Sequence, residues 1–522
     1  MRRLQITVLD LVSTGGGRSL FGRIMNANLA SLMPQVVAAW CEELGHHVRY
    51  VSYTGVEDLA AELGHDTDVL IVGAFTRAAH AAYAISNLAR RRGAITVLGG
   101  PHARCYPEDA VRYFDYVLGF TDKKIIADLL RDGAPHRPIG RRISAAGQPL
   151  ELPSLEQRWK FVEATNAKAP LLKVVPMIGS MGCPYTCSFC IDSVVDYQPL
   201  AFDQIRADLR FLLANRKRPC VAWHDPNFGV RFNDYMAAIE DVVPAGQMRF
   251  VAESSLSLLS EPHLERLRKN GFVAILPGIE SWYAFGAKSK SGRQVGLDKV
   301  RRVAEHVNMI LRHIPYVQTN FVLGIDSDAG DEPFELTKRF IDLAPGAYTA
   351  FSMFTAYGRA APINLELQQA GRVLPFPFHL LNSNHVTNVR PKNYAWDDFY
   401  ARAFDLTRYA LSWPRAFRRF EASRGLAAKS LGLVRVGSSK RVEFQARLLQ
   451  MLRTDLGVRR FYEGESTRLP TFYRARLQKS LGALWDHLPS GALMHDQNAY
   501  LKSSIIARMM RPSQPLAAPV PG

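Results

Sequence analysis

The most informative stretch of the 522-residue sequence is Gly182-Cys183-Pro184-Tyr185-Thr186-Cys187-Ser188-Phe189-Cys190. Its cysteines are spaced C-x-x-x-C-x-x-C and come directly after Leu171–Met177, an apolar run that predicts a strand. Three thiolates on one short loop can hold three irons of a 4Fe–4S cube, which leaves the fourth iron without a protein ligand. An open position is typical of a catalytic metal site, whereas a structural zinc site would need a fourth ligand, for which Cys220 and His224 are the candidates.

The cysteine loop stands at the start of a series in which strands and helices alternate. After Leu171–Met177, strands are predicted at Val221–His224, Arg249–Glu253, Ala274–Ile279, Tyr316–Leu323 and Tyr348–Phe354. Six such units predict a partial or full β/α barrel, whose active site would lie at the carboxyl ends of the strands. Carboxylates and a hydroxyl fall at three successive strand ends, at Asp225, Glu253, Glu280 and Ser281.

With these features the chain resembles the radical S-adenosylmethionine enzymes. The resemblance rests on the cysteine spacing, the Gly-Cys-Pro entry, and the segments Gly278–Ser281 and Phe321–Ile325, which look like fourth- and fifth-strand motifs of that family. It implies that Cys183, Cys187 and Cys190 carry a 4Fe–4S cluster, on which S-adenosylmethionine is cleaved to methionine and a 5′-deoxyadenosyl radical. The S-adenosylmethionine contacts expected from it are Phe189, Asp225, Glu253, Gly278, Glu280 and Ser281, and no further catalytic residue is predicted.

Residues 4–135 form a separate alternating series. Five short strands are predicted, at Ile6–Val12, Val48–Tyr53, Val69–Gly73, Ile95–Leu98 and Tyr116–Leu118. Helical stretches lie between or after them, at Leu29–Leu44, Ala78–Arg92 and Lys123–Leu130. This α/β pattern predicts a doubly wound, flavodoxin-like sheet, in which a ligand binds beyond the carboxyl ends of the strands.

The N-terminal series resembles the cobalamin-binding domain that precedes the barrel in one branch of the radical S-adenosylmethionine enzymes, chiefly through Val97–Ala103 and Val72–Thr76. The cobalamin contacts that it implies are Thr14, Gly15, Gly73, Thr76, Gly99, Gly100, Pro101 and His102. Some such domains carry D-x-H-x-x-G after the first strand, where the histidine binds below cobalt. Val12 occupies that position here, so we expect cobalt with a weak or empty lower position. A degenerate domain that keeps the fold without cobalamin is the alternative.

The net charge of +17 is concentrated at the end of the chain, because residues 401–522 contain 21 basic and 8 acidic residues. Periodicity in Phe399–Leu411 and Val442–Leu456 predicts helices there. Clusters such as Arg415, Arg418 and Arg419 stand beside aromatic residues, as do Arg459 and Arg460. This pattern suits an anionic group on an apolar body, or an anionic membrane surface; the alternative is that the arginines simply flank a helical core.

Five segments are therefore expected: a cobalamin-binding-like domain (1–135), a linker (136–170), a radical S-adenosylmethionine core (171–395), a basic α-helical domain (396–510) and a disordered Pro-rich tail (511–522). With 47% hydrophobic and 22% charged residues, the composition is that of a soluble globular protein. We expect a cytoplasmic location, because the N-terminus lacks a secretory pattern and three of six cysteines cluster as metal ligands.

The expected cofactors are thus a 4Fe–4S cluster, S-adenosylmethionine and cobalamin. They imply a radical enzyme, a methyltransferase acting on an unactivated carbon of a small-molecule or lipid-like substrate that carries an anionic group. The expected partners are an electron donor such as flavodoxin or ferredoxin and a peripheral membrane contact, and nucleic acid is not among them. The alternatives are radical cyclisation or rearrangement without methyl transfer, cobalamin-free radical modification of RNA, and a non-catalytic iron–sulfur or cobalamin sensor.

Overall fold

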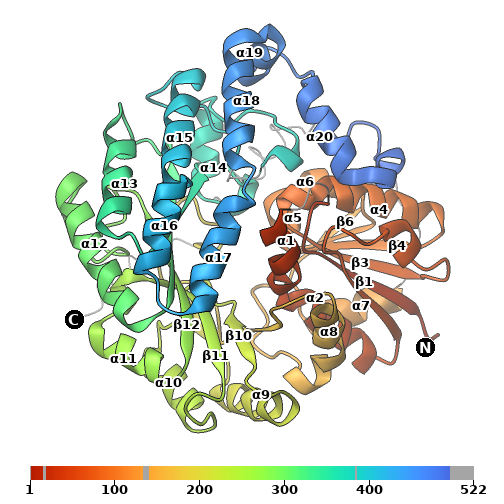
Figure 1. Cartoon of the computed structure of the whole chain (residues 1–522). Coiled ribbons are helices and arrows are strands. Elements are labelled where there is room, and N and C mark those ends of the chain that lie inside the picture. Colours follow the sequence, from red (N-terminus) through yellow and green to blue (C-terminus); the bar gives the residue numbers. More distant parts are fainter. Residues whose placement is uncertain (1, 16–18, 133–139, 382–384, 494–522) are drawn as a thin grey trace.

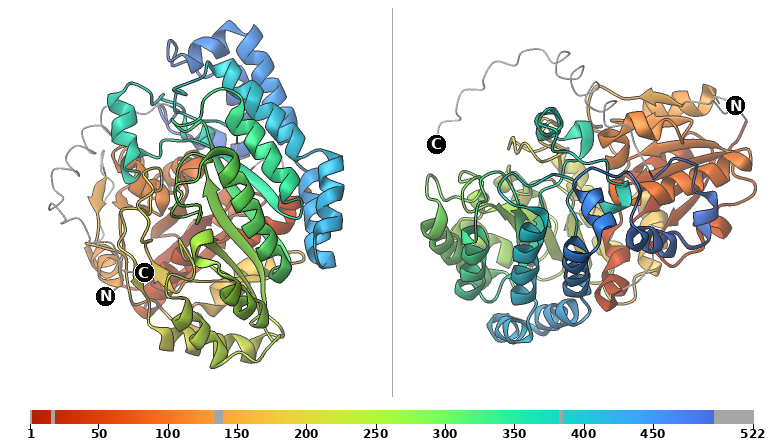
Figure 2. Two further views of the ribbon diagram at one scale, coloured as in Figure 1. Left: turned by 90° about the vertical axis from the view of Figure 1, so that its left-hand side faces the viewer. Right: turned by 90° about the horizontal axis from the view of Figure 1, so that it is seen from above.

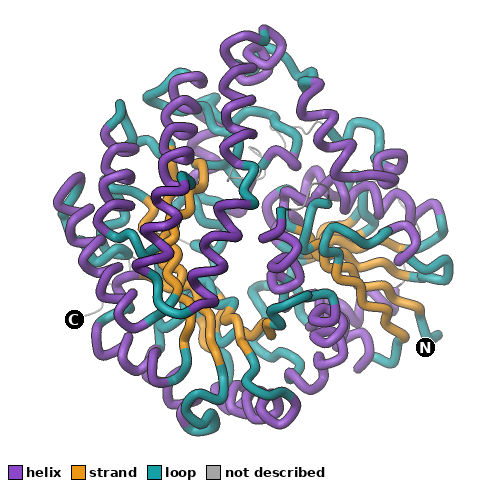
Figure 3. Tube along the Cα trace, in the orientation of Figure 1, coloured by secondary structure: helices purple, strands orange, loops and turns teal. Residues whose placement is uncertain are grey.

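The computed structural model describes residues 2–15, 19–132, 140–381 and 385–493. Two six-stranded parallel sheets lie beside each other, and a set of C-terminal helices covers one side of both (Figure 1). In each half the strands lie inside and helices lie outside (Figure 3). The predicted α/β architecture is therefore confirmed, whereas the tail predicted at 511–522 lies outside the described residues.

The N-terminal sheet has the strand order β2-β1-β3-β4-β5-β6. Its strands are β1 (Gln5–Leu11), β2 (His47–Ser52), β3 (Val69–Ala74), β4 (Ile95–Gly99), β5 (Tyr116–Leu118) and β6 (Arg141–Ile143). All five predicted strands are present. Successive side chains point to opposite faces, so Ile6 and Val8 belong to one apolar core and Leu9 and Leu11 to another. Helices α2 (Leu32–Glu43) and α7 (Lys123–Asp132) cover the first face and α4 (Ala79–Arg91) covers the second.

The segment expected to be a linker contributes two regular elements. The three-residue strand β6 pairs in parallel with β5 and forms the edge of the sheet. Helix α8 (Leu155–Ala167) begins with a capping box between Ser154 and Gln157 and packs against α2 and β2. Leu155 and Val162 lie on one helical face, because they are seven residues or about two turns apart, and the adjacent Phe161 packs into the other apolar core.

The second sheet has the order β7-β10-β11-β12-β13-β14 and is open, with β7 and β14 at its edges. Its strands are β7 (Val174–Met177), β10 (Cys220–Trp223), β11 (Arg249–Ser255), β12 (Phe272–Glu280), β13 (Tyr316–Leu323) and β14 (Tyr348–Met353). All six predicted strands are present, and the sheet is a partial barrel. Its outer side carries α9 (Phe202–Asn215), α10 (Phe232–Glu240), α11 (Glu261–Lys269), α12 (Gly296–His313) and α13 (Glu332–Leu343) (Figure 2).

The C-terminal region is helical, as predicted. Its helices are α15 (Trp396–Ala410), α16 (Trp413–Ala422), α17 (Leu426–Gly437), α18 (Arg441–Thr454), α19 (Leu456–Tyr462) and α20 (Thr471–Leu481). Helix α15 packs against α13 of the barrel, whereas the chain after α20 packs against α4 of the N-terminal sheet. There the Asn87 side chain donates to the carbonyl of His487 at 2.8 Å. This region therefore connects the two sheets. None of the helices in the described part of the chain is both long and apolar enough to cross a membrane.

Candidate functional site

The cysteine loop is fixed at its base by a short antiparallel pair, β8 (Ser180–Met181) with β9 (Gln198–Pro199). Gly182 follows β8 with φ of +69°, and a Cβ there would stand 2.3 Å from the carbonyl oxygen of Asp196. Only glycine fits a left-handed position this close to another backbone. The loop therefore leaves the carboxyl end of β7 in a defined direction, with the Cys183 N–H donating to Val195 at 3.4 Å.

Cys183, Cys187 and Cys190 are free thiols and half-buried, whereas Cys41, Cys105 and Cys220 are buried. Burial raises the pKa of all three loop thiols, that of Cys190 to about 11, and the nearby Lys288 cation opposes the rise. Cys187 also interacts electrostatically with Cys183 and with Cys190, which places the three thiols near one another. Metal binding requires thiolates, so loading this loop would release protons.

The two candidates for a fourth ligand do not lie on this loop. Cys220 begins β10 and pairs with Val174, so it lies at the amino end of the sheet, away from the loop that follows Met177. His224 follows the other end of β10, and burial lowers its pKa to about 4. Across the described ranges, no three His, Cys, Asp or Glu side chains form a group that could hold a single metal ion.

Glu280, the last residue of β12, forms an ion pair with Lys288 beside the cysteine loop. Lys288 Nζ donates to Glu280 Oε1 at 2.5 Å, and both side chains are largely buried. Burial alone would lower the pKa of Lys288, but Glu280 and the thiolates of Cys187 and Cys190 raise it. A Cβ on Gly278 would stand 2.2 Å from Glu280 Oε1, so the missing side chain makes room for the pair.

The backbone around Glu280 is unusual for a strand end. Glu280 has φ of +66°, which is rare for a residue with a Cβ, and the β12–β13 register shifts between Gly278 and Glu280. Glu253 on β11 interacts electrostatically with both members of the pair. The Glu253 side chain has access to solvent, but protein atoms surround its carboxylate on most sides. The partial loss of water around the carboxylate raises the pKa of Glu253, Lys288 opposes this rise, and Glu280 adds to it. One cation therefore interacts with two carboxylates and with the thiols of the cysteine loop.

Asp225, at the carboxyl end of β10, is held by hydrogen bonds from the protein. Its carboxylate is buried and accepts hydrogen bonds from the Gly179 N–H at 3.0 Å and from Ser180 Oγ at 2.6 Å. The Tyr235 hydroxyl donates a third. Burial raises the pKa of Asp225 and these hydrogen bonds oppose the rise. Asp225 therefore anchors the strand end that leads into the cysteine loop.

The two remaining residues expected at the S-adenosylmethionine site have local partners. Phe189 packs edge-to-face on Phe285, with ring centroids 5.3 Å apart, in a small apolar cluster with Phe354. Ser281 is buried, and its hydroxyl accepts the Tyr283 N–H at 3.1 Å. Phe189 thus anchors the cysteine loop in an apolar cluster, and Ser281 stabilises the turn after β12.

The glycines expected to contact cobalamin differ in their surroundings. A Cβ on Gly99 would meet no atom within 4 Å, so open space lies beyond the end of β4. Gly100 has φ of +88° and approaches the backbone of Ala74. Gly73 packs against the Pro34 ring, since a Cβ there would stand 2.8 Å from it. Of these glycines, Gly99 offers the clearest approach for a ligand.

The residues at the start of the following helices face the protein interior. His102 is fully buried one residue after Pro101, and its Nε2 lies 2.7 Å from the Tyr83 hydroxyl, which donates to Asp109 at 2.9 Å. Thr76 is buried too. These side chains stabilise the packing under the strand ends.

A cavity of about 560 Å³ lies between the two sheets and the C-terminal helices. Thr14 and Gly15, predicted from the sequence, line it after β1, and Arg77 lines it after β3. All these strands are parallel, but β2 lies on one side of β1 and β3 on the other, so the strand order changes direction at β1, which is where doubly wound sheets bind ligands. The Ser480 hydroxyl of α20 donates to the carbonyls of both Thr14 and Gly15.

Most basic residues of this cavity were not singled out from the sequence. They come from α17, α18 and α20 and their connections: Arg435, Lys440, Arg441, Arg476 and Lys479. The charge surplus of the tail was the only sequence signal, and it pointed to other residues. Arg419 donates to the Ala347 carbonyl at 3.0 Å, and Arg418 lies 3.6 Å from Asp342.

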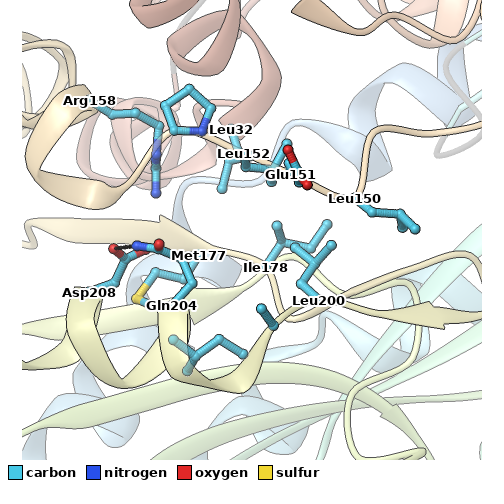
Figure 4. A pocket seen from close by; sticks show the side chains of 13 residues that line it. Leu32, Leu150, Glu151, Leu152, Arg158, Met177, Ile178, Leu200, Gln204 and Asp208 are labelled. Carbon is cyan, nitrogen blue, oxygen red and sulfur yellow. Dashed lines mark hydrogen bonds between the residues drawn. The ribbon is translucent and has the colours of Figure 1, made fainter.

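A smaller cavity of about 160 Å³ lies where α2 meets β7 and α9 (Figure 4). Leucines and Met177 form much of its wall, and the Gln204 side chain donates to Asp208 at 2.7 Å beside it. Its size and largely aliphatic lining suit no cofactor considered above.

No family model matches the chain. Bacteriochlorophyllide d C-8(2)-methyltransferase of Chlorobaculum tepidum is 27% identical over 250 residues, 45% of this chain and 54% of that protein. Bacteriochlorophyllide d C-12(1)-methyltransferase of the same organism is 23% identical over 298 residues, which are 56% of this chain and 64% of that protein. Hopanoid C-2 methylase of Rhodopseudomonas palustris is 25% identical over 324 residues, which are 59% of this chain and 58% of that protein. The chain thus spans less than two thirds of the length of these curated relatives.

Two solved structures share the fold. The cobalamin-dependent S-adenosylmethionine radical enzyme OxsB superposes with a TM-score of 0.54 at 11% identity, over 97% of this chain and 83% of that one. The radical S-adenosylmethionine methyltransferase TsrM of Kitasatospora setae has a TM-score of 0.50 at 15% identity, over 71% of this chain and 75% of that one. The fold is that of the cobalamin-binding radical S-adenosylmethionine proteins. These likenesses agree with the resemblance inferred from the cysteine motif, and the curated relatives are named as methyltransferases or as a methylase.

Proposed function

We propose that this chain is a cobalamin-dependent radical S-adenosylmethionine C-methyltransferase. The observation that carries the proposal is the loop of three free, half-buried cysteines at the carboxyl end of the first barrel strand, in the same chain as a cavity at the switch point of a doubly wound sheet. The curated relatives are named as methyltransferases, which favours methyl transfer over cyclisation or rearrangement.

The residues present fit the three groups. Three free, half-buried thiols on one loop, with Cys187 interacting electrostatically with the other two, suit an open 4Fe–4S cluster. Glu253, accessible to solvent beside the Lys288–Glu280 pair, suits an ammonium or ribose hydroxyl. The open space beyond Gly99 and the cavity beside Thr14 and Gly15 suit a large flat cofactor.

When bound, the cluster with S-adenosylmethionine supplies a 5′-deoxyadenosyl radical, and cobalamin supplies the methyl group. The chain itself has three tasks in this reaction. Cys183, Cys187 and Cys190 hold the irons, while Asp225 holds the start of their loop. Glu253 orients the amino end of S-adenosylmethionine. The packed rings of Phe189 and Phe285 exclude water from one side of the loop.

The substrate class follows from the relatives. Their names specify bacteriochlorophyllide d and hopanoids as substrates, so we propose a small-molecule or lipid-like substrate for this chain. An external one-electron donor such as flavodoxin or ferredoxin would reduce the cluster, and a peripheral membrane contact would bring a lipid-like substrate within reach.

The test is anaerobic reconstitution with iron and sulfide, followed by reduction with dithionite. We expect a 4Fe–4S absorption band and cleavage of S-adenosylmethionine in the wild type, and loss of both in Cys183→Ala, Cys187→Ala and Cys190→Ala. The matched control is Cys220→Ala, which should keep both the absorption band and the cleavage of S-adenosylmethionine. If Cys220→Ala abolishes iron loading, the site has four cysteine ligands and the proposal fails. Methyl transfer itself is tested with S-adenosylmethionine labelled at its methyl group, whose label must appear in the product or in methylcobalamin.

A further inference from the structure

The cavity between the sheets has an uncompensated positive charge. Six lysine and arginine side chains line it, and no Asp or Glu is among its described lining residues. None of the six forms an ion pair with an acidic residue of the described chain; they are Arg77, Arg435, Lys440, Arg441, Arg476 and Lys479. Two of the three histidines in the lining add no charge near pH 7, because burial lowers the pKa of His379 and brings that of His80 to about 4.

Arg441, the first residue of α18, is the most informative of the six. Its Nε and Nη2 atoms are buried and have no hydrogen-bond partner among the described residues. The guanidinium lies 5.7 Å from the centroid of the Phe351 ring. Burial lowers the pKa of Arg441 to about 10, so the group stays charged at neutral pH.

The two arginines with the least exposed side chains, Arg158 and Arg419, each donate to a protein acceptor, whereas among the described residues Arg441 has two unpartnered guanidinium nitrogens and Arg419 has one. Arg158 donates to Gln35 Oε1 at 3.0 Å, and Arg419 donates to the Ala347 carbonyl at 3.0 Å. Buried polar groups in native proteins are almost always satisfied, and a buried charge without a partner points to a missing ion or ligand. Arg441 lines the cavity, so a partner for its guanidinium would come from that side.

Neutral groups hold the neighbouring cations in place. Arg435 donates to the Tyr316 hydroxyl at 2.8 Å and lies over the Tyr348 ring at 3.7 Å. Arg476 lies over the Phe444 ring at 4.6 Å. These partners fix the positions of the guanidinium groups without neutralising them, which is the arrangement of a preorganised anion site.

We propose that the cavity is an anion-binding site centred on Arg441, which takes a phosphate or carboxylate group carried by a largely apolar molecule. The planar guanidinium can bind either group through two parallel hydrogen bonds. Apolar side chains complete the lining and suit the body of such a molecule: Leu380, Val386, Phe444, Leu477 and Leu481. The site itself stands on the cavity and its charges; only the source of the anion rests on the proposed function.

Two sources have this chemistry. The nucleotide tail of cobalamin contains a phosphodiester, and Thr14 and Gly15 of the same cavity lie where a cofactor of the N-terminal sheet would bind. The other source is the substrate, whose anionic group would be held while its apolar part reaches the barrel. Both sources put a negative group against Arg441.

The test uses the full-length chain, three probes and three variants. The probes are inorganic pyrophosphate, cyanocobalamin and dicyanocobinamide, a corrinoid that lacks the nucleotide phosphate. The variants are Arg441→Met, Arg441→Lys and the control Arg418→Met, a largely exposed arginine of the same region. We expect pyrophosphate to bind the wild type and Arg418→Met alike, at least tenfold more weakly to Arg441→Met, and with intermediate affinity to Arg441→Lys. Pyrophosphate should raise the melting temperature of the wild type but not of Arg441→Met.

The corrinoids distinguish the sources. If Arg441→Met weakens cyanocobalamin but not dicyanocobinamide, the anion is the cofactor phosphate; if both corrinoids bind as to the wild type, it belongs to the substrate. Equal pyrophosphate affinity of Arg441→Met and Arg418→Met overturns the proposal. Arg441→Met should still load its cluster and should melt no lower than the unliganded wild type, because it loses an unpaired buried charge. A wild type that binds pyrophosphate but never cleaves S-adenosylmethionine would refute the proposed function and leave the anion site standing.

Discussion

Replacing Asp225 tests whether this carboxylate anchors the cysteine loop or contacts S-adenosylmethionine. Asp225→Ala leaves three buried donors without their acceptor: the Gly179 N–H and the hydroxyls of Ser180 and Tyr235. A hydrogen bond to a charged group contributes about 1.5–3 kcal/mol, and local relaxation recovers part of three such losses, so we expect a loss of about 4 kcal/mol. Tyr235→Phe removes one donor and should cost about 1–2 kcal/mol.

The assay combines thermal unfolding with iron content after anaerobic reconstitution. At about 2–4 °C per kcal/mol for a domain of this size, Asp225→Ala should lower the melting temperature by roughly 8–16 °C. Its iron content should fall as well, because Gly179 and Ser180 lead directly into the loop that carries Cys183. Tyr235→Phe should lie between the wild type and Asp225→Ala in both measurements. An Asp225→Ala protein that melts like the wild type and loads its cluster, yet fails to bind S-adenosylmethionine, would refute the anchoring role.

Two further substitutions address the ion pair at the barrel and the N-terminal sheet. Gly278→Ala should displace Lys288 from Glu280 and weaken S-adenosylmethionine binding about tenfold at full cluster content, whereas Gly147→Ala, where a Cβ meets nothing within 4 Å, should change neither quantity. Burial raises the pKa of Asp10 to about 7 from 3.8, so its stabilising protonated form is fully present below about pH 3.8 and its contribution is lost as the pH rises through about 7. Asp10→Asn should therefore be more stable than the wild type in urea at pH 8, by up to about 4 kcal/mol, and the difference should vanish near pH 4.

The strands could be predicted because most of them are buried on both faces. Parallel strands covered by helices are continuous apolar runs, such as Val69–Ala74, and these stand out against the amphipathic helices between them. The missed strand, Arg141–Ile143, has three residues at a sheet edge and two exposed arginines. The missed helix α8 buries only one face, and its polar residues gave the whole segment the composition of a linker.

Site residues were harder to predict because their roles depend on packing between distant segments. A carboxylate at a strand end looks the same in the sequence whether it turns outward, as Glu253 does, or inward to three donors, as Asp225 does. His102 follows a glycine pair that suits a ligand, yet its ring packs inside the sheet domain beside Tyr83. The cysteine spacing alone carried enough local information to predict a site directly.

The C-terminal helices form the third wall of the cavity and therefore determine what the cavity can bind. The N-terminal sheet contributes its switch point at Gly15, and the barrel contributes its edge strand β14 through Tyr348, which leaves one side to be closed by α17, α18 and α20. Closure is tight: a Cβ on Gly15 would stand 2.3 Å from the Ser480 carbonyl oxygen. The cysteine loop, by contrast, lies at the carboxyl ends of the barrel strands and has no cavity wall in common with these helices. On the functions proposed here, cluster chemistry and ligand selection would lie in different parts of the chain, so we expect a change in the basic helices to alter the anionic ligand while the chemistry at the three cysteines stays the same.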